Sequence, residues 1–443
     1  MRSIMLYFRS ALIVVAVCVT SSLAYAVEVQ SVVSPGGIRA WLVRDVSVPL
    51  ISMSFEFKGG TALDPDGKEG LANMVSALLD EGAADMDSQT FQGKLEDLSV
   101  SIGFSASRSS FSGRLQTLSR HQDEAFRLLT VALASPRFDE KPVERIRTQI
   151  ISGLKAQEKN PDAIAGRVFA KHIYGSHPFS KPSQGLEDTV KAITRDDLVS
   201  FTKRRFAKDN LIVGVVGDVS PEKLAGILDR VFGGLPDAAA SWDIPELDPA
   251  FDGGVLVEKL DIPQSRVLFA QPGVARDDPD YYATYVANHI LGGGGFSSRL
   301  YTEVREKRGL AYSASSYLST GEVVNILAGS AGTQNSRVAE TVDVIRDVWQ
   351  KMQEEGPTDD EITAAIQYLT GSWPLNFDRS ASIAGMLVTV QSLDLGIDYL
   401  DRRNDYLTSL KPGEIKTAIQ KLLNPERLTF VIVGEPDPPV HGQ

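Results

Sequence analysis

The sequence predicts an α+β protein of two homologous lobes, each a mixed or antiparallel β-sheet with helices packed on one face. Three observations predict it: one strand-and-turn signature occurs early in each half, a second occurs late in each half, and pairs of helical segments separate the strands. Paired helices favour an α+β sheet, whereas single helical crossovers favour a parallel α/β sheet. The chain has 443 residues, which at roughly 100–200 residues per domain allows two to four domains.

The early signature is an extended apolar run that ends at glycine. It occurs as Leu50–Lys58 and as Ser265–Gln271, and the closing glycines lie 214 positions apart (273 − 59). The late signature is a buried-strand pattern closed by glycine and an acid. It occurs as Asn210–Asp218 and as Leu428–Glu435, with glycines 217 positions apart (434 − 217). Chance similarity could explain either pair alone, but two pairs at nearly one offset indicate a duplicated unit.

Helical periodicity fills the rest of each half. Thr358 with Glu361 forms a capping box that begins one helix, and Thr194 with Asp197 begins another in the same way. The stretch 236–252 is rich in Pro, Ala and Asp and lacks periodicity, so we expect it to link domains at 27–235 and 253–443. The expected helices are 69–79, 118–135, 141–159, 163–173 and 194–206, then 278–291, 337–355, 359–371, 380–393 and 412–423.

Residues 1–26 read as a signal peptide. A short basic start precedes the apolar stretch Ala11–Thr20, and Ala24–Ala26 forms a small-x-small cleavage site. The apolar stretch falls short of the roughly 20 residues that span a membrane, and Val17 before Cys18 does not fit a lipoprotein site. We therefore expect export, cleavage after Ala26, and a periplasmic protein without a stable membrane anchor. Because Cys18 is the single cysteine, disulfides and thiolate zinc sites are excluded.

Composition and charge exclude further classes. With 43% hydrophobic and 23% charged residues, the chain is an ordinary globular protein. It carries 45 Lys and Arg against 57 Asp and Glu, a formal charge of −12. This balance argues against nucleic acid as a partner, because phosphate binding needs a basic face, and against an anionic membrane surface. An acidic surface could attract basic peptides, but a role in solubility is the better explanation.

The residues alone offer no self-contained active site. None of the five histidines lies in H-E-x-x-H or H-x-x-E-H, the patterns that place two imidazoles and a base on one helical face. His172 and His177 are five apart, but Gly175 and Pro178 predict a turn there. The chain also lacks a G-x-x-x-x-G-K-[ST] phosphate loop and a G-x-S-x-G nucleophile elbow.

One cluster stands out, the four-glycine run Gly292, Gly293, Gly294 and Gly295 within LGGGGFSSRL. Consecutive glycines lose much backbone entropy on ordering, so they mark a mobile or closely approached loop. A phosphate cradle would need a downstream Lys-Ser/Thr. Two interpretations stay open: a flexible loop between lobes, or a binding surface with the following arginine and tyrosine as polar groups.

The segment 291–313, LGGGGFSSRLYTEVREKRGLAYS, resembles the second-half signature of the pitrilysin family of zinc metallopeptidases, which includes the mitochondrial processing peptidase. The resemblance covers nearly all of the chain after residue 26. It implies two homologous α+β halves joined by a linker, which together form half of a clamshell. Further matching landmarks are Gly59–Thr61, Asp66–Ala72, Tyr174–Gly185, Ile193–Leu198 and Asn210–Asp218.

The chain departs from the family at its metal site. Where the family has G-L-A-H-x-x-E-H, this chain reads GLANMVSA, with Asn73 and Ala77 at the histidine positions and Ser76 at the general-base glutamate. Alignment places Gly153 at the third ligand, a glutamate in the family. Zinc there needs two imidazoles, a carboxylate and a glutamate to deprotonate water. We therefore expect no cofactor in this chain and no proteolysis by it alone.

The second-half signature keeps a polar pair, Arg305 and Tyr312. The resemblance implies that such a pair serves the zinc-bearing half, the tyrosine hydroxyl stabilising the oxyanion and the arginine holding a substrate carbonyl. The structural alternative is a surface arginine and a buried tyrosine in an ordinary turn, and Lys307 and Arg308 are expected to be solvated. By the same resemblance, 98–112 matches a substrate-pairing edge strand.

These observations predict a non-catalytic subunit of a heterodimeric zinc metallopeptidase that acts on peptides or unfolded segments. Its partner would be a homologous chain that bears H-x-x-E-H and the zinc. The alternative is a catalytically silent scaffold or peptide-binding member, against which the retained Arg305 and Tyr312 speak. A self-sufficient peptidase with unrecognised ligands fails for lack of paired histidines.

Overall fold

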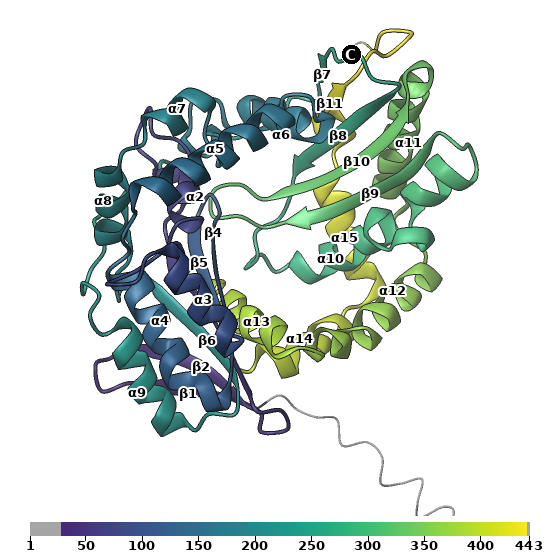
Figure 1. Ribbon diagram of the computed structural model, residues 1–443. Helices are drawn as coiled ribbons and strands as arrows, with labels where there is room; N and C mark the ends of the chain where they lie inside the picture. The colour runs from purple at the N-terminus through teal and green to yellow at the C-terminus, as the bar shows by residue number, and fades with distance from the viewer. Residues whose placement is uncertain (1–27, 441–443) are drawn as a thin grey trace, which may run out of the picture.

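The computed structural model describes residues 28–440, so the expected signal peptide at 1–26 lies outside them. Two lobes, each built on one β-sheet, face each other in Figure 1. The first sheet has strand order β1-β2-β6-β3-β5-β4 and the second β7-β11-β8-β10-β9. No helix within residues 28–440 has both the length and the apolar character needed to cross a membrane.

Both sheets are mixed, and they share one pattern. Antiparallel pairing dominates, but β2 pairs with β6 and β7 with β11 in parallel, so the last strand of each lobe lies beside the first strands. The two lobes thus repeat one topology, which confirms the predicted α+β class. The strands are β1 Val29–Val33, β2 Arg39–Arg44, β3 Leu50–Lys58, β4 Ser101–Ala106, β5 Ser110–Leu118, β6 Leu211–Gly217, β7 Val255–Glu258, β8 Gln264–Pro272, β9 Ala311–Ser319, β10 Ile326–Gln334 and β11 Thr429–Val433.

Most helices match the expected ranges, and both predicted capping boxes, at Thr194 and Thr358, are formed. Two expectations are wrong in extent. The helix expected over 118–135 begins only at Gln122, because the chain up to Leu118 pairs with β3. The first-lobe helices are α2 Leu71–Ser76, α3 Ser88–Leu98, α4 Gln122–Ala134, α5 Glu140–Gln157, α6 Pro161–Tyr174, α7 Glu187–Ala192, α8 Arg195–Arg205 and α9 Pro221–Phe232.

The second wrong extent concerns α2, expected over 69–79. It starts after Gly70, whose φ of 94° is left-handed, and ends at Ser76. A side chain at Gly70 would also meet the backbone of Gln184, so this glycine fixes where α2 begins. The second-lobe helices are α10 Tyr281–Asn288, α11 Val338–Glu355, α12 Asp359–Gly371, α13 Ser380–Ser392, α14 Tyr399–Thr408 and α15 Pro412–Leu422.

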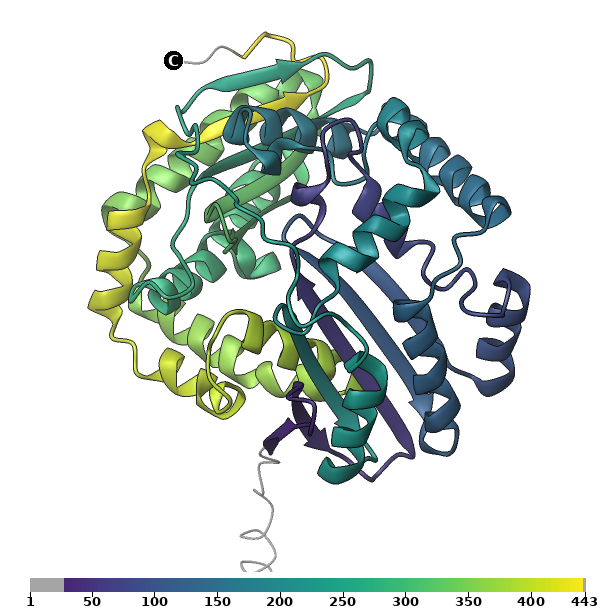
Figure 2. The same cartoon turned by 90° about the vertical axis from the view of Figure 1, so that its left-hand side faces the viewer.

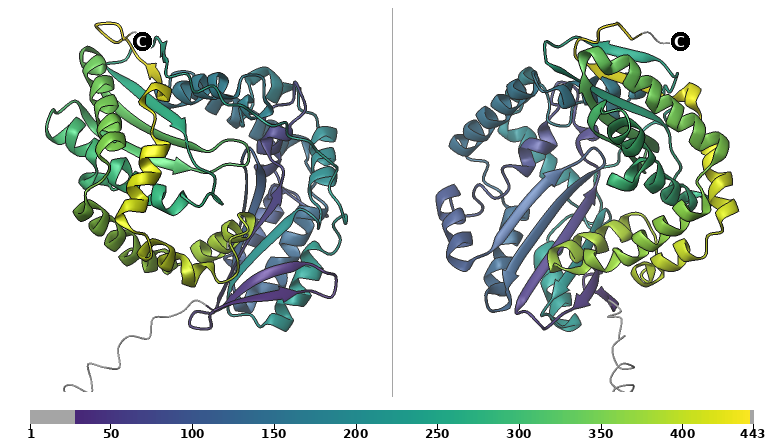
Figure 3. Two further views of the ribbon diagram at one scale, coloured as in Figure 1. Left: turned by 180° about the vertical axis from the view of Figure 1, so that it is seen from behind. Right: turned by 90° about the vertical axis from the view of Figure 1, so that its right-hand side faces the viewer.

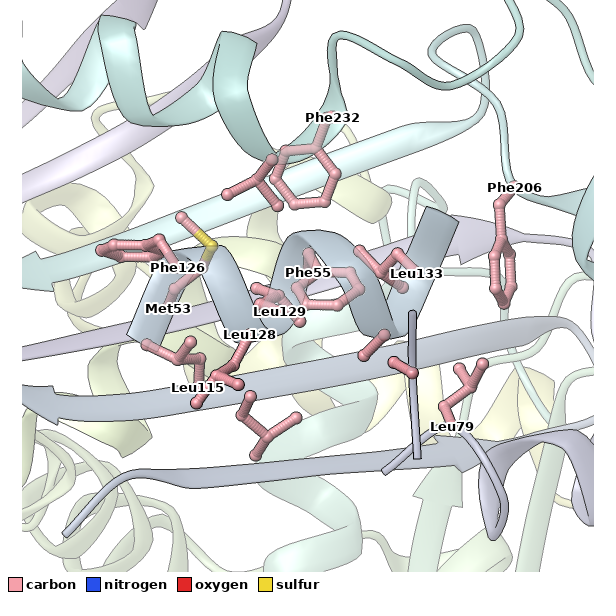
Figure 4. Packing of buried hydrophobic residues seen from close by; sticks show 14 of the residues in the cluster. Met53, Phe55, Leu79, Leu115, Phe126, Leu128, Leu129, Leu133, Phe206 and Phe232 are labelled. Atoms are coloured by element: carbon pink, nitrogen blue, oxygen red, sulfur yellow. The ribbon is translucent and has the colours of Figure 1, made fainter. Parts of the chain in front are cut away.

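Each lobe has its own apolar core between its sheet and its helices. In the first lobe, Phe55 meets Phe232 of α9 edge-on with ring centroids 5.3 Å apart (Figure 4). In the second lobe, the fully buried Trp349 of α11 donates its indole N–H to Gln271 Oε1 at 2.7 Å. The two lobes therefore have separate hydrophobic cores.

The lobes also exchange one helix each. Helix α6 of the first half packs on β8 and β11 of the second sheet, and α13 of the second half packs on β6 and β3 of the first sheet (Figure 3). The two helices begin 219 positions apart (380 − 161), close to the offset of the repeat. Each sheet is thus covered by its own helices on one face and by a helix of the other lobe on the opposite face.

Between the lobes, residues 239–254 have neither helix nor strand and run from the first lobe to the second (Figure 2). Phe251 in this segment is buried in a small apolar cluster with Phe169 and Ile173 of α6. The connecting segment is therefore packed against the exchanged helix.

Candidate functional site

The structure brings Arg305 and Tyr312 together. Arg305 lies in the π-helical turn Tyr301–Glu306, and Tyr312 lies at the start of β9, an edge strand of the second sheet. The Arg305 guanidinium is 4.5 Å from the ring centroid of Tyr312 and 5.0 Å from that of Tyr301. Cation–π attraction of about 0.5–1 kcal/mol per exposed contact holds the cation between the rings.

The guanidinium and the hydroxyl of this pair form no hydrogen bond and no ion pair within residues 28–440. Glu303 binds Lys307 at 2.6 Å and Arg308 at 2.5 Å, and both cations lower the pKa of the Glu303 carboxyl through hydrogen bonds. The Arg305 guanidinium takes part in no ion pair or hydrogen bond within the described residues. Tyr312 is 80% exposed, so the alternative of a buried tyrosine is wrong. The pair presents unused donors to solvent.

The first two glycines of the four-glycine run, Gly292 and Gly293, end a second π-helical turn, His289–Gly293, and Gly295 begins a 3₁₀ turn. Gly292 is buried, and a Cβ there would lie 2.4 Å from the Ser316 backbone nitrogen on β9. Gly292 therefore allows the chain to approach the backbone of β9 closely. Close approach was one of the predicted reasons for the glycine run. Gly295 has a left-handed φ of 58° and is exposed. π-Helical turns are rare and frequently occur at functional sites, and here two flank one edge strand.

The four expected degenerate positions do not fit zinc. Ser76 in α2 donates its hydroxyl to the carbonyl oxygen of Asn73 at 2.8 Å, and Ala77 follows the helix. Gly153 lies exposed on α5. An amide, a hydroxyl, a methyl group and a hydrogen atom replace imidazoles and carboxylates. Across residues 28–440, no three His, Cys, Asp or Glu side chains gather in a way that could hold a metal ion.

Comparison with known proteins agrees with this arrangement. Residues 192–369 match the family described as Peptidase M16 inactive domain. The non-peptidase homologue YmxG of Helicobacter pylori is 26% identical over 391 residues, which are 87% of this chain and 89% of that protein. The peptidase M16 inactive domain from Pseudomonas fluorescens superposes with a TM-score of 0.87 at 28% identity, covering 94% of this chain and 99% of that one. The chain is thus similar in sequence and fold to M16 peptidase-family proteins over most of its length, as the predicted resemblance implied.

The match to a model described as an inactive domain and the similarity to a non-peptidase homologue agree with the predicted loss of the metal site. The fold of this chain also matches that of the periplasmic protease PqqL from Escherichia coli, with a TM-score of 0.79 at 17% identity. That match covers 92% of this chain but 46% of PqqL. The chain therefore corresponds in fold to about half of that protease.

Two neighbours of the Arg305–Tyr312 pair were not predicted from the sequence. Tyr301 stacks on Arg305 from one turn earlier, and the exposed Phe296 packs edge-on against Tyr301 with ring centroids 4.9 Å apart. The spacing of four residues between Tyr301 and Arg305 was a usable signal, since such residues share one face of a helical turn.

A zinc measurement tests the loss of the M16 metal site. We expect the purified chain to bind no stoichiometric zinc and to cleave no peptide, because Asn73, Ser76, Ala77 and Gly153 replace every required group. Metal content is measured by mass spectrometry after dialysis. The combined change Asn73→His, Ser76→Glu, Ala77→His and Gly153→Glu supplies a ligand set and is expected to raise zinc content without restoring full activity, because the supporting hydrogen bonds are missing. One tightly held zinc in the unmodified chain would contradict this.

Asp64 caps the start of α2 through backbone hydrogen bonds, a role that no sequence motif predicted. Its carboxylate accepts hydrogen bonds from the backbone N–H groups of Gly70 at 2.9 Å and Ala72 at 3.1 Å. Burial raises the pKa of Asp64 to about 7, although these backbone donors and the Lys181 charge oppose the rise. The helix that carries the former metal positions therefore begins at a carboxyl group that titrates near neutral pH.

This pKa predicts a pH dependence of folding stability. The folded protein retains the Asp64 proton up to pH of about 7, whereas the unfolded chain releases it near pH 4. The contribution of Asp64 to the free energy of unfolding is therefore complete below about pH 4. It decreases as the pH rises and is lost above pH of about 7. Between pH 5 and 7.5, urea denaturation should show the unmodified chain losing about 2 kcal/mol more than Asp64→Asn.

A matched control is Asp66→Asn. Asp66 is 94% exposed and pairs with Lys181 at 2.8 Å, and hydrogen bonding to Lys181 lowers its pKa. Its titration lies below this pH window, so Asp66→Asn should follow the unmodified chain. Parallel pH profiles for Asp64→Asn and the unmodified chain would refute the assignment.

Proposed function

We propose that this chain is the non-catalytic subunit of a heterodimeric zinc metallopeptidase, exported to the periplasm and acting on peptides or unfolded segments. The partner is a homologous chain that bears H-x-x-E-H and holds the zinc. The observation that carries the proposal is the Arg305–Tyr312 pair, stacked together at 4.5 Å with its polar groups unused. An arginine and a tyrosine retained in this state serve a group outside the chain.

The chemistry of the pair suits the support of peptide cleavage. The Tyr312 hydroxyl donates a hydrogen bond to the oxygen that becomes negative when a peptide carbonyl is attacked. Arg305 donates to a neighbouring substrate carbonyl, and its charge adds to the field at that oxygen. The turn formed by Gly292, Gly293, Gly294 and Gly295 supplies the adjoining surface against which the substrate backbone lies, since glycine permits close approach.

Chain length supports a second subunit. PqqL is a periplasmic protease, and this chain covers 46% of it. A second chain of similar size would bring the assembly to that length. The predicted signal peptide at 1–26 supports the same compartment.

A second candidate is a catalytically silent scaffold or peptide-binding subunit. It is favoured by the relative from Helicobacter pylori, which is described as a non-peptidase homologue. A scaffold has no use for a stacked, exposed arginine and tyrosine, so we place this candidate second.

Reconstitution tests the proposal. The chain is co-expressed with homologous H-x-x-E-H chains encoded in the same genome, and co-purification and cleavage of a quenched fluorescent peptide are followed. We expect a stable complex on gel filtration, with activity only when both chains are present. Full activity of the H-x-x-E-H chain alone, or the absence of a complex, would contradict the proposal.

A further inference from the structure

A cavity with a volume of about 1310 Å³ lies between the two lobes. Its walls come from α5, α6, the segment 180–186 and the start of α7 in the first half, and from β8, β9 and β10 in the second. The cavity lining does not include Arg305, Tyr312 or the glycine run. It also includes none of the four degenerate metal positions. The volume exceeds the roughly 300–1000 Å³ of pockets that take small ligands, so a peptide fits it better.

The floor of the cavity is formed by the second sheet, on the face that α6 covers in part. Leu268, Ser330 and Tyr317 line it, and the register pairs Ser330 with Leu268 and Ala328 with Tyr317, so these side chains lie on one face. Helix α6 covers the same face farther in, above β8 and β11. The floor ends at β9, an edge strand whose outer backbone groups pair with no other strand within residues 28–440.

Arg108 lines the same cavity and has no carboxylate partner within residues 28–440. It lies in the turn between β4 and β5, is half-buried, and donates its Nε–H to the Phe179 carbonyl oxygen at 2.9 Å. Its guanidinium is 5.9 Å from the ring centroid of Tyr174, at the end of α6. Burial raises the pKa of the Tyr174 hydroxyl, so this hydroxyl is neutral and remains a hydrogen-bond donor. Tyr317, half-exposed on β9, completes the group from the other lobe.

The cavity is cationic in an anionic protein. Six cationic side chains line it against four anionic ones, although the whole chain carries −12. Three cations are paired: Lys155 with Glu187, Lys181 with Asp66, and Arg266 with Asp162. Within residues 28–440 the other three, Arg108, Arg167 and Lys171, form no ion pair, and neither do the lining acids Glu69 and Glu158. The imbalance favours a negatively charged ligand, because low-dielectric walls concentrate the field of unpaired charges.

We propose that this cavity binds an extended peptide through a carboxylate held by Arg108, with the peptide backbone added to the edge of β9. Arginine binds carboxylates through two parallel N–H donors, and edge strands accept peptides through backbone hydrogen bonds. The tyrosines of α6 and β9 provide apolar contact beside the charge. The carboxylate comes either from the peptide C-terminus or from an acidic side chain. The site goes beyond the proposed function, since it needs neither Arg305, Tyr312 nor a second subunit.

Fluorescence anisotropy with the purified chain alone tests this site. Four peptides of about ten Ala, Ser and Tyr residues carry the same neutral fluorophore: a free C-terminus, a C-terminal amide, an amide with two Glu, and an amide with two Lys. We expect the free-acid peptide, the Glu peptide or both to bind about tenfold more tightly than the neutral amide. Tighter binding of only one of them identifies the source of the carboxylate. The proposal is overturned if the free-acid and Glu peptides bind no more tightly than the neutral amide, or if the Lys peptide binds most tightly.

Variants locate the binding. Arg108→Gln keeps a side-chain donor for Phe179 but removes the charge, and we expect it to abolish the tenfold preference. The matched control is Arg204→Gln, an exposed arginine of α8 that lies outside the cavity and forms no ion pair in the described chain. If thermal unfolding shows that Arg108→Gln does not fold, the double change Arg167→Gln with Lys171→Gln replaces it. Both of these residues are exposed on α6, and the preference should fall about threefold. An unchanged preference in a folded cavity variant overturns the proposal, whereas the activity of the two-chain complex is judged separately.

Discussion

In the reconstituted two-chain peptidase, Tyr312→Phe is expected to lower kcat by about 10²–10³-fold while KM changes little. A hydroxyl aimed at the developing oxyanion acts in the transition state, and removing one such donor costs a factor of this size. Tyr312 is 80% exposed and its hydroxyl forms no hydrogen bond within residues 28–440. The change therefore leaves folding and assembly intact. Steady-state kinetics on a fluorogenic peptide measure both constants.

Two further variants sharpen this experiment. Arg305→Ala removes a contact that already exists with bound substrate, so KM should rise along with a loss of kcat. Tyr368→Phe is the matched control, because Tyr368 is also exposed, at 63%, but lies on α12 stacked against His289. It should keep full activity. Turnover near that of the unmodified complex for Tyr312→Phe, with assembly intact on gel filtration, would make this chain a structural subunit.

The strands and most helices were predictable because their signals are local. β3 spans the predicted Leu50–Lys58, and α12 begins after the capping residue Thr358. Alternation and caps act over a few residues, so one sequence reveals them. The extent of α2 was not predictable in the same way. Its start depends on Gly70, whose conformation and contact with Gln184 are set by a distant loop.

The candidate residues Arg305 and Tyr312 could be named from the sequence, but their exposure and mutual contact could not. The resemblance to the pitrilysin family marked Arg305 and Tyr312, and the structure stacks the two side chains on each other. The exposure of Tyr312 follows from its place at the end of an edge strand, which depends on the order of strands in the sheet. The cationic cavity likewise combines Arg108 with residues of α6 and β9, and no sequence spacing connects these elements.

The exchange of α6 and α13 could not be predicted from the sequence either, because an apolar helix face does not reveal which sheet it covers. It leads to the second large expected effect. Gly214 of β6 lies under α13, and a Cβ there would be 2.5 Å from the Ala384 carbonyl oxygen and 2.8 Å from Leu387 Cβ. Neither atom lies at the end of a flexible side chain, so the helix or the strand must shift. We expect Gly214→Ala to lower the free energy of unfolding by about 3 kcal/mol, as overpacking does in rigid cores.

Gly226→Ala provides a control of opposite sign. Gly226 lies inside α9 with no atom within 4 Å of the added Cβ, so the change should raise stability by about 0.5–1 kcal/mol through higher helix propensity. Urea denaturation measures both variants.

The packing of α13 on the first sheet also predicts an effect of Gly214→Ala outside the sheet. The side-chain N–H of Gln391 on α13 donates to the Val213 carbonyl oxygen at 3.0 Å, and Ser392 donates to Glu56 at 3.1 Å. Displacing the helix weakens these contacts between lobes, so Gly214→Ala should also speed chymotrypsin cleavage in the connecting segment 239–254, where Phe251 is buried. Unchanged stability and cleavage would mean that α13 is not held against the first sheet.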